Sequence, residues 1–373
     1  MNSNRGKGKQ HRFLPLLIIA GVFAAAWIGG TDSYAHKAPE KETVRIIVKS
    51  SPNAEYQSAK EWRDSKLIRA VMEGVPGEQI PPATLLDTEL HFVAKQNKVQ
   101  FAVTPDGDVV DDRGMVLGID KESKEKLKKT VAEIRTKHYG EYIPWLQADL
   151  EMPKYSSFAI VDLETGLRFQ GQRRAGSQHA DVQPLTKEDT NIMKTIYQGS
   201  WSWNRRAVLV KVNGRTFAAS MHGMPHGGDG IPGNGFNGHF CIHFLGSVTH
   251  GSRSLDLMHQ AMVHKAAGRL SYFLAQQSPF ELVDIWISGN HQHDAQLLWG
   301  TTGSNQDDPD RFAGMRRLSD FPVADPGRLL AIDIPVRVSV TESGGKLSSM
   351  NLVFHVERSS EKSRWVISHV SFT

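Results

Sequence analysis

The stretch of the chain that decides its fold reads NGFNGHFCIH and occupies residues 234–243. Polar and apolar residues alternate through its second half, which predicts a strand, because successive strand side chains point to opposite faces. His239, Cys241 and His243 then share one face, and the phenylalanine and isoleucine between them point into a core. The pattern predicts a β-rich unit that presents a thiol between two imidazoles.

Cys241 is the only cysteine among the 373 residues, and the glycine-rich segment before it contains a further histidine, His226. A cysteine attacks as its thiolate, and a neighbouring imidazole can take up the thiol proton. We therefore expect a thiolate–imidazolium pair in which the pKa of Cys241 is lowered. Glycines such as Gly227 and Gly238 let the backbone approach a substrate, with amide groups directed at a developing oxyanion.

This segment resembles the catalytic domain of the L,D-transpeptidases, the YkuD-like family. The family pattern is an upstream His-Gly followed by Ser/Thr-His-Gly-Cys, an apolar residue and Arg. His226-Gly227 matches the upstream pair, His239 the second histidine and Cys241 the nucleophile. The resemblance covers residues 152–277.

The resemblance implies that Cys241 attacks a peptide carbonyl of a peptidoglycan stem and forms a thioester, from which the acyl group passes to an amine or to water. His226 would be the base and His239 a supporting polar residue. Neither a metal nor another cofactor is expected for this reaction. The substrate contacts that we expect come from four residues, namely Gly227, Gly238, His243 and Ser247.

Three positions of this chain differ from the family pattern. Gly238 stands where the family has Ser or Thr, and Phe240 stands where it has Gly. His243 replaces the arginine, and an imidazole binds a carboxylate less firmly than a bidentate guanidinium does.

The same residue types permit two other interpretations. Zinc takes nitrogen and sulfur ligands, so the cluster could belong to a zinc-dependent hydrolase. The i, i+4 histidine pairs would need a helix, whereas glycine and the alternation favour loop and strand. A non-catalytic peptidoglycan-binding protein of the cell envelope is the third interpretation. The residues available to a metal are Cys241, His222, His226, His239, His243, His250, His179 and Asp181.

The N-terminus has the pattern of an export signal, in which basic residues precede an uncharged apolar run at 13–30. Small residues near position 35 suit cleavage, while the run is long enough to serve as an uncleaved membrane anchor. In either case the rest of the chain is expected on the extracytoplasmic side, as a membrane-attached or secreted protein. The basic residues are Arg5, Lys7, Lys9 and Arg12.

Length and composition indicate a globular protein of two or three domains, with 39% hydrophobic and 23% charged residues. The 44 Lys and Arg against 40 Asp and Glu are spread along the chain, so a nucleic-acid partner is not expected. We expect a multidomain protein, mainly β plus α+β. Its expected parts are a signal peptide or anchor (1–35), a small α/β domain (42–150), an L,D-transpeptidase-like β domain (152–277) and a small antiparallel α+β domain (279–373).

Local patterns predict most of the individual elements. Asn213-Gly214 is a strong signal for a type I′ hairpin turn. The expected helices are 59–73, 121–135, 187–198 and a single long one at 256–276. The expected strands are 44–48, the hairpins within 89–103, 158–170 and 207–220, and a meander of 329–340, 349–357 and 365–372.

Overall fold

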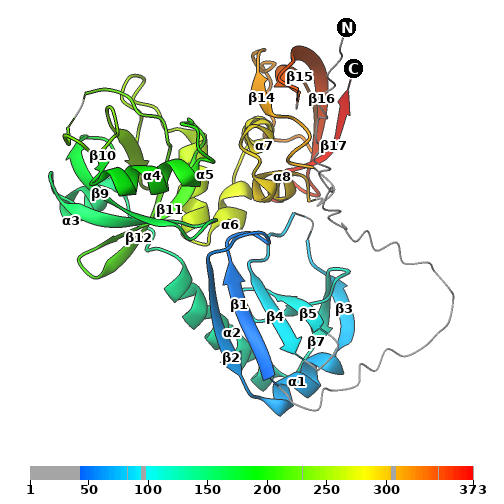
Figure 1. Ribbon diagram of the computed structural model, residues 1–373. Helices are drawn as coiled ribbons and strands as arrows, with labels where there is room; N and C mark the ends of the chain where they lie inside the picture. The colour runs from blue at the N-terminus through cyan, green and yellow to red at the C-terminus, as the bar shows by residue number, and fades with distance from the viewer. Residues whose placement is uncertain are drawn as a thin grey trace, which may run out of the picture. The chain divides into compact units, whose positions relative to one another are not determined.

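The computed structural model describes residues 43–372 with gaps at 82, 94–97, 229, 304–307 and 343. Within these residues the chain is mainly β, a mixed α+β multidomain protein with three sheets and eight helices (Figure 1). The expected signal or anchor at 1–35 lies outside the described residues. No helix among those described is long and apolar enough to cross a membrane.

The first sheet has seven strands in the order β2-β1-β4-β5-β6-β7-β3, and all its pairs are antiparallel. The expected α/β class for this part is therefore wrong, because the sheet has no parallel pair with a crossover helix. Its elements are β1 (Thr43–Lys49), β2 (Gln57–Trp62), α1 (Ser65–Met72), β3 (Val75–Gln79), β4 (Thr88–Val93), β5 (Lys98–Val103), β6 (Val109–Val110), β7 (Met115–Gly118) and α2 (Lys121–His138).

The helix expected at 59–73 is only half correct. Its first part is the edge strand β2, which pairs along its whole length with β1. The helix begins at Ser65, because the Asp64 side chain accepts a hydrogen bond from the Leu67 amide and caps its first turn. Pairing with a distant strand overrides the local helical spacing here.

The second sheet is a closed barrel with the strand order β10-β13-β12-β11-β8-β9. The expected hairpin turn is confirmed, since Asn213 and Gly214 both have positive φ, at 51° and 77°. The buried residues of α3 and its flanks belong to the barrel core, so the barrel unit begins before the expected residue 152. The elements are α3 (Trp145–Glu151), β8 (Ser157–Asp162), β9 (Arg168–Ala175), β10 (Ala180–Pro184), α4 (Lys187–Ile196), β11 (Arg206–Val212), β12 (Arg215–Met221) and β13 (Phe240–His243).

The long helix expected at 256–276 is wrong, because the structure has two helices, α5 (Leu257–Ala266) and α6 (Leu270–Leu274). The break contains Gly268 at φ +66°, where a Cβ would lie 2.6 Å from the Tyr139 ring. Residues Met258 to Ala266 of α5 are all buried. A helix buried on every side connects the core of the first sheet with the outer face of the barrel.

The third sheet has four antiparallel strands in the order β14-β15-β16-β17, which confirms the expected C-terminal α+β part and its meander. The side chains of α7 and α8 that are buried against it complete a separate core. The elements are α7 (Pro279–Gln292), α8 (Ala295–Thr302), β14 (Gly314–Arg317), β15 (Ala331–Thr341), β16 (Leu347–Glu357) and β17 (Val366–Phe372).

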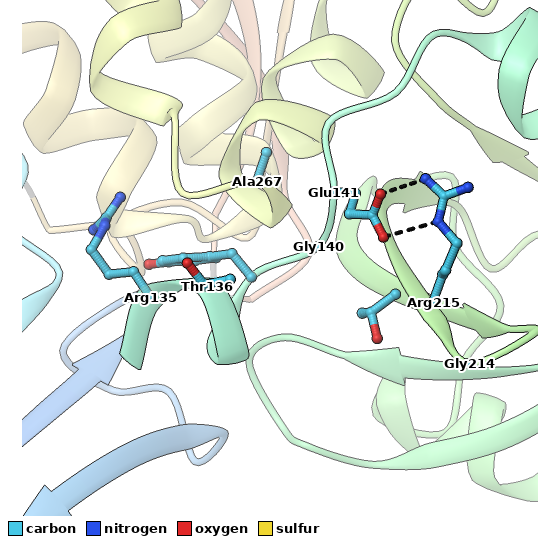
Figure 2. A pocket seen from close by; sticks show the side chains of 9 residues that line it. Arg135, Thr136, Gly140, Glu141, Gly214, Arg215 and Ala267 are labelled. Carbon is cyan, nitrogen blue, oxygen red and sulfur yellow. Dashed lines mark hydrogen bonds and ion pairs between the residues drawn. The ribbon is translucent and has the colours of Figure 1, made fainter. Parts of the chain in front are cut away.

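The segment that follows α2 lies directly against the barrel strand β12. The Glu141 amide donates to the Thr216 carbonyl at 2.8 Å, and its carboxylate pairs with Arg215 (Figure 2). A Cβ on Gly140 would lie 2.3 Å from the backbone nitrogen of Ala218, so only glycine permits this approach. The pocket beside this contact has neither a cysteine nor a histidine in its lining.

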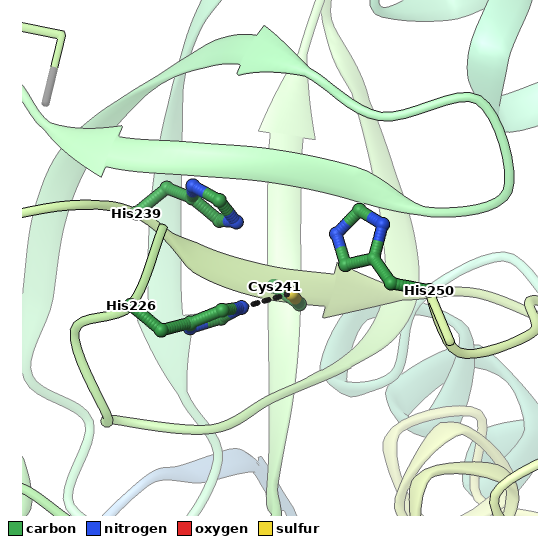
Figure 3. Close-up of side chains that lie close together, drawn as sticks. All are labelled: His226, His239, Cys241 and His250. Atoms are coloured by element: carbon green, nitrogen blue, oxygen red, sulfur yellow. Dashed lines mark hydrogen bonds between the residues drawn. The ribbon is translucent and has the colours of Figure 1, made fainter. Parts of the chain in front are cut away.

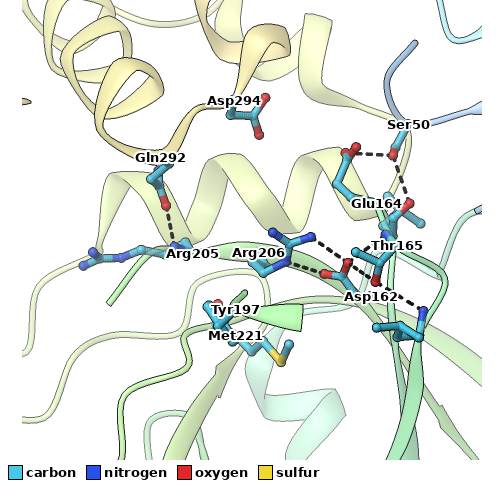
Figure 4. Close-up of polar contacts among 12 residues, drawn as sticks. Ser50, Asp162, Glu164, Thr165, Tyr197, Arg205, Arg206, Met221, Gln292 and Asp294 are labelled. Carbon is cyan, nitrogen blue, oxygen red and sulfur yellow. Dashed lines mark hydrogen bonds and ion pairs between the residues drawn. The ribbon is translucent and has the colours of Figure 1, made fainter. Parts of the chain in front are cut away.

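Buried charges join α5 to the elements around it. The Lys265 ammonium is 2.9 Å from a Glu164 carboxylate oxygen and 2.8 Å from one of Asp294, and only 4% of its side chain is exposed. Burial raises the pKa of Glu164, but Lys265 and two serine hydroxyls outweigh burial and lower it to about 2. Figure 4 shows the Ser50 hydroxyl at Glu164 and the bidentate pair of Arg206 with the buried Asp162.

Replacing Lys265 tests this charge cluster. We expect Lys265→Met to lower the free energy of unfolding by about 1–3 kcal/mol at neutral pH, because two partly buried carboxylates lose their partner. In the wild type the folded-state pKa of Glu164 is below the unfolded value of about 4.3. Its contribution is therefore complete above about pH 5 and is lost as the pH falls towards 2.

Chemical denaturation at pH 7 and at pH 3 measures both effects. Lys346→Met, at an exposed turn between β15 and β16, is the matched control and should change stability by less than about 0.5 kcal/mol. Equal stability of the two variants at pH 7 would contradict the prediction.

Candidate active site around Cys241

The pairing of β13 with β10 positions the thiol. In this antiparallel register Cys241 lies directly opposite Asp181, so the two side chains occupy the same face. The Cys241 Sγ is 3.8 Å from the Asp181 Oδ1, and Cys241 is 4% exposed. Phe240 and Ile242 belong to the barrel core, which confirms the expected alternation along this strand.

His226 lies beside the thiol, with its Nε2 3.4 Å from the Cys241 Sγ (Figure 3). Its other ring nitrogen, Nδ1, is 3.1 Å from the Met224 carbonyl, which can only accept a hydrogen bond. Nδ1 therefore carries a proton, and in the neutral ring Nε2 has its lone pair towards the thiol. The imidazole has the tautomer that a general base needs.

A backbone bridge holds His226 against His239. Their amides and carbonyls exchange two hydrogen bonds, at 3.0 Å and 2.7 Å. Gly227 and Gly238 flank the bridge at φ +71° and +107°. A Cβ on Gly227 would lie 2.3 Å from the His239 ring. A Cβ on Gly238 would lie 2.4 Å from the His226 carbonyl oxygen. The two glycines thus allow the two histidines to lie in contact. The contact with a substrate that we expect of Gly227 and Gly238 stays a prediction.

Gln183 fastens the loop that carries these histidines, and the sequence reasoning did not single it out. Its amide nitrogen donates to the Gly238 carbonyl at 2.5 Å, and its oxygen accepts from the Ile231 amide and the Asn234 side chain. Gln183 is 1% exposed. A glutamine in an otherwise buried strand was the available signal, because a buried amide needs partners that the strand alone does not supply.

Asp181 is the centre of a histidine cluster. Its Oδ1 is 2.9 Å from His250 Nε2, 3.3 Å from His179 Nε2 and 3.7 Å from His239 Nε2. Burial raises the pKa of Asp181, but the His179 hydrogen bond and the neighbouring imidazoles lower it to about 2. Asp181 is therefore a carboxylate beside the thiol, and the structure brings His179 and His250 into the site together with it.

Two of the expected substrate-binding residues lie in the interior. His243 is 2% exposed, and its ring stacks between His259 at 3.8 Å and His179 at 4.5 Å. Burial, and then the neighbouring histidines and Arg205, lower its pKa to about 2, so it is neutral. Ser247 is fully buried and its hydroxyl accepts from the Phe244 amide at 2.9 Å. Neither side chain is exposed for the contact with a substrate that was expected of it.

The expected thiolate–imidazolium pair is not the resting state of this site. Burial, and then the Asp181 carboxylate, raise the pKa of Cys241 well above its usual range. The resting form of Cys241 is therefore a neutral thiol. For the sulfur to act as a nucleophile, the thiol proton would have to move to a base, and His226 is in contact with the sulfur.

Among the described residues, two overlapping groups bring four potential metal ligands within 4.8 Å of one another. Comparison of the chain with protein-family models, curated proteins and solved structures gave no match. The function is therefore inferred from the geometry of these side chains. The groups are His226, His239, Cys241 and His250, and His179, Asp181, Cys241 and His250.

Removing the carboxylate opposite the thiol tests its electrostatic effect. We expect Asp181→Asn to lower the pKa of Cys241, because the negative charge that opposes the thiolate is gone. A shift of one unit increases the thiolate fraction about tenfold at any pH below the pKa. The rate of iodoacetamide labelling between pH 6 and 10, followed by intact mass in EDTA, measures the shift.

Asp333→Asn is the control, since Asp333 lies on β15 in the third sheet. A labelling profile that is the same in Asp181→Asn and the wild type would show that the carboxylate does not set the thiol pKa.

Proposed function

We propose that the protein is an extracytoplasmic cysteine acyltransferase of the L,D-transpeptidase kind that acts on peptide stems of peptidoglycan. The observation that carries this proposal is the position of His226 Nε2, 3.4 Å from the Cys241 Sγ, with Nδ1 fixed by the Met224 carbonyl. A nucleophile, a base and a group that orients the base stand in the order that covalent catalysis requires. The export signal expected in the sequence supports a location next to that substrate.

In the first step the Cys241 sulfur attacks the peptide carbonyl carbon while its proton passes to His226 Nε2. A C–S bond forms, and the carbonyl oxygen becomes an oxyanion. His226 then gives the proton to the leaving amine as the C–N bond breaks, which leaves a thioester on Cys241. An acceptor amine or water attacks the thioester, His226 takes its proton, and the sulfur leaves and recovers a proton from His226.

His239 is the group that we assign to support the substrate. Its Nε2 is buried and has no hydrogen-bond partner within the described residues. Burial lowers the pKa of His239, so the ring is neutral and can donate one hydrogen bond. A donor beside the nucleophile suits the carbonyl oxygen on which charge develops.

The acyl-transfer interpretation is favoured over the other two. A non-catalytic peptidoglycan-binding protein needs no imidazole aligned with a thiol. A hydrolytic zinc keeps one coordination position open for water, whereas each cluster at Cys241 offers four protein ligands. The alignment of His226 with Cys241 supplies the base that acyl transfer requires.

Acylation of the intact protein tests the proposal. A carbapenem or a stem tetrapeptide should give one covalent adduct on Cys241, detected by intact mass, and none in Cys241→Ala. His226→Ala should slow its formation about 10²–10⁴-fold, because no group then takes the thiol proton.

His355→Ala is the matched control, since His355 pairs with Asp333 on the third sheet and should leave the rate unchanged. Adduct formation at the wild-type rate in His226→Ala would refute the role of this base. No adduct from either compound would refute the acyltransferase.

A further inference from the structure

Three imidazole side chains from separate positions converge on the Cys241 sulfur, and acyl transfer needs only some of them. Figure 3 shows the rings of His226, His239 and His250 around the sulfur. One ligand atom of each of the four residues lies within 4.8 Å of all the others. His250 reaches the cluster from the loop after β13, and it has no part in the acyl-transfer steps described above.

The spacing is close to that of a tetrahedral metal site. Zinc–sulfur and zinc–nitrogen bonds of about 2.3 and 2.0–2.1 Å place neighbouring ligands about 3.4–3.6 Å apart. The separation of 3.4 Å between the Cys241 Sγ and His226 Nε2 already agrees. The widest pair must close by about 1 Å, and the His250 side chain, which is 51% exposed, has room to move.

The surroundings of the cluster also suit a cation. The Met224 carbonyl orients His226 through Nδ1, the outer-shell contact typical of histidine ligands. The buried Nε2 of His239 lacks a hydrogen-bond partner in the described part of the chain, and a metal would satisfy it. The carboxylate of Asp181, 2.9 Å from His250 Nε2, supplies negative charge.

We propose that this cluster binds one Zn²⁺ through the Cys241 thiolate, His226, His239 and His250, and that the bound ion switches off acyl transfer. The thiol proton leaves to solvent as the Zn–S bond forms. Four protein ligands fill a tetrahedral shell and leave no position for a catalytic water. The bound ion would engage both the Cys241 sulfur and His226, so neither could take part in acyl transfer. The inhibition, unlike the metal site itself, rests on the proposed function.

Cobalt(II) titration of the full chain, purified with a chelator, tests the site without any substrate. We expect one Co²⁺ per chain, the intense visible bands of a tetrahedral ion and a thiolate-to-cobalt band in the near ultraviolet, all removed by one equivalent of Zn²⁺. Cys241→Ser should lose the near-ultraviolet band. His239→Ala and His250→Ala should each weaken binding at least tenfold, and His355→Ala should not.

Absence of Co²⁺ binding, an octahedral spectrum, or a spectrum that is unchanged in both His239→Ala and His250→Ala would overturn the metal site. If circular dichroism shows that His250→Ala is misfolded, His250→Gln replaces it, because glutamine keeps a polar side chain of similar length.

Two further readouts separate this proposal from the proposed function. Zinc should slow iodoacetamide labelling of Cys241 at least tenfold in the wild type and much less in His250→Ala, whether or not the protein is an acyltransferase. If the protein is acylated in EDTA and added zinc stops the acylation, both proposals are supported. If the protein binds the metal but is not acylated, the proposed function and its regulation are overturned, while the metal site stands. If the protein is acylated and zinc does not slow the acylation, the regulation is overturned.

Discussion

The pairing of β10 with β13 is the constraint on which the site depends. It places Asp181 opposite Cys241, while β12 fixes the other side of β13 by pairing Ser220 with His243. Because side chains alternate along a strand, a slip of one residue would turn the thiol into the barrel core. A strand held on both sides in a closed barrel has no free edge along which to slip. The barrel thus fixes the nucleophile and its neighbouring carboxylate as one unit.

His226, the proposed base, is held differently, because it lies on a loop. Two sets of hydrogen bonds fix the position of this loop. The first is the backbone bridge between His226 and His239, which the flanking glycines make sterically possible. The second is the three hydrogen bonds to Gln183. A buried amide with these partners is costly to displace, since each broken bond leaves an unsatisfied polar group. The loop is therefore positioned from the same strand, β10, that carries Asp181.

The sequence could predict those features that depend on near neighbours. Strand alternation placed Cys241 on the polar face of β13, and Asn213-Gly214 located a hairpin. The closure of the barrel could not be predicted, because it joins strands that are 60 residues apart. For the same reason the lowered pKa expected for Cys241 was wrong: the spacing shows neither that the Asp181 carboxylate lies opposite the thiol nor how deeply the thiol is buried. The interior position of His243 depends equally on distant rings.

The carboxylate of Asp181 gives the site opposite properties with and without a cation. Without one, its charge and the burial of the sulfur keep Cys241 protonated, and the protonated thiol is the less reactive form. A metal ion reverses the local charge, so that the thiolate becomes the favoured state. In the two proposals, substrate attack and metal binding both remove the same proton, the first to His226 and the second to solvent. Since each needs the sulfur lone pair and the His226 Nε2, one excludes the other at this site.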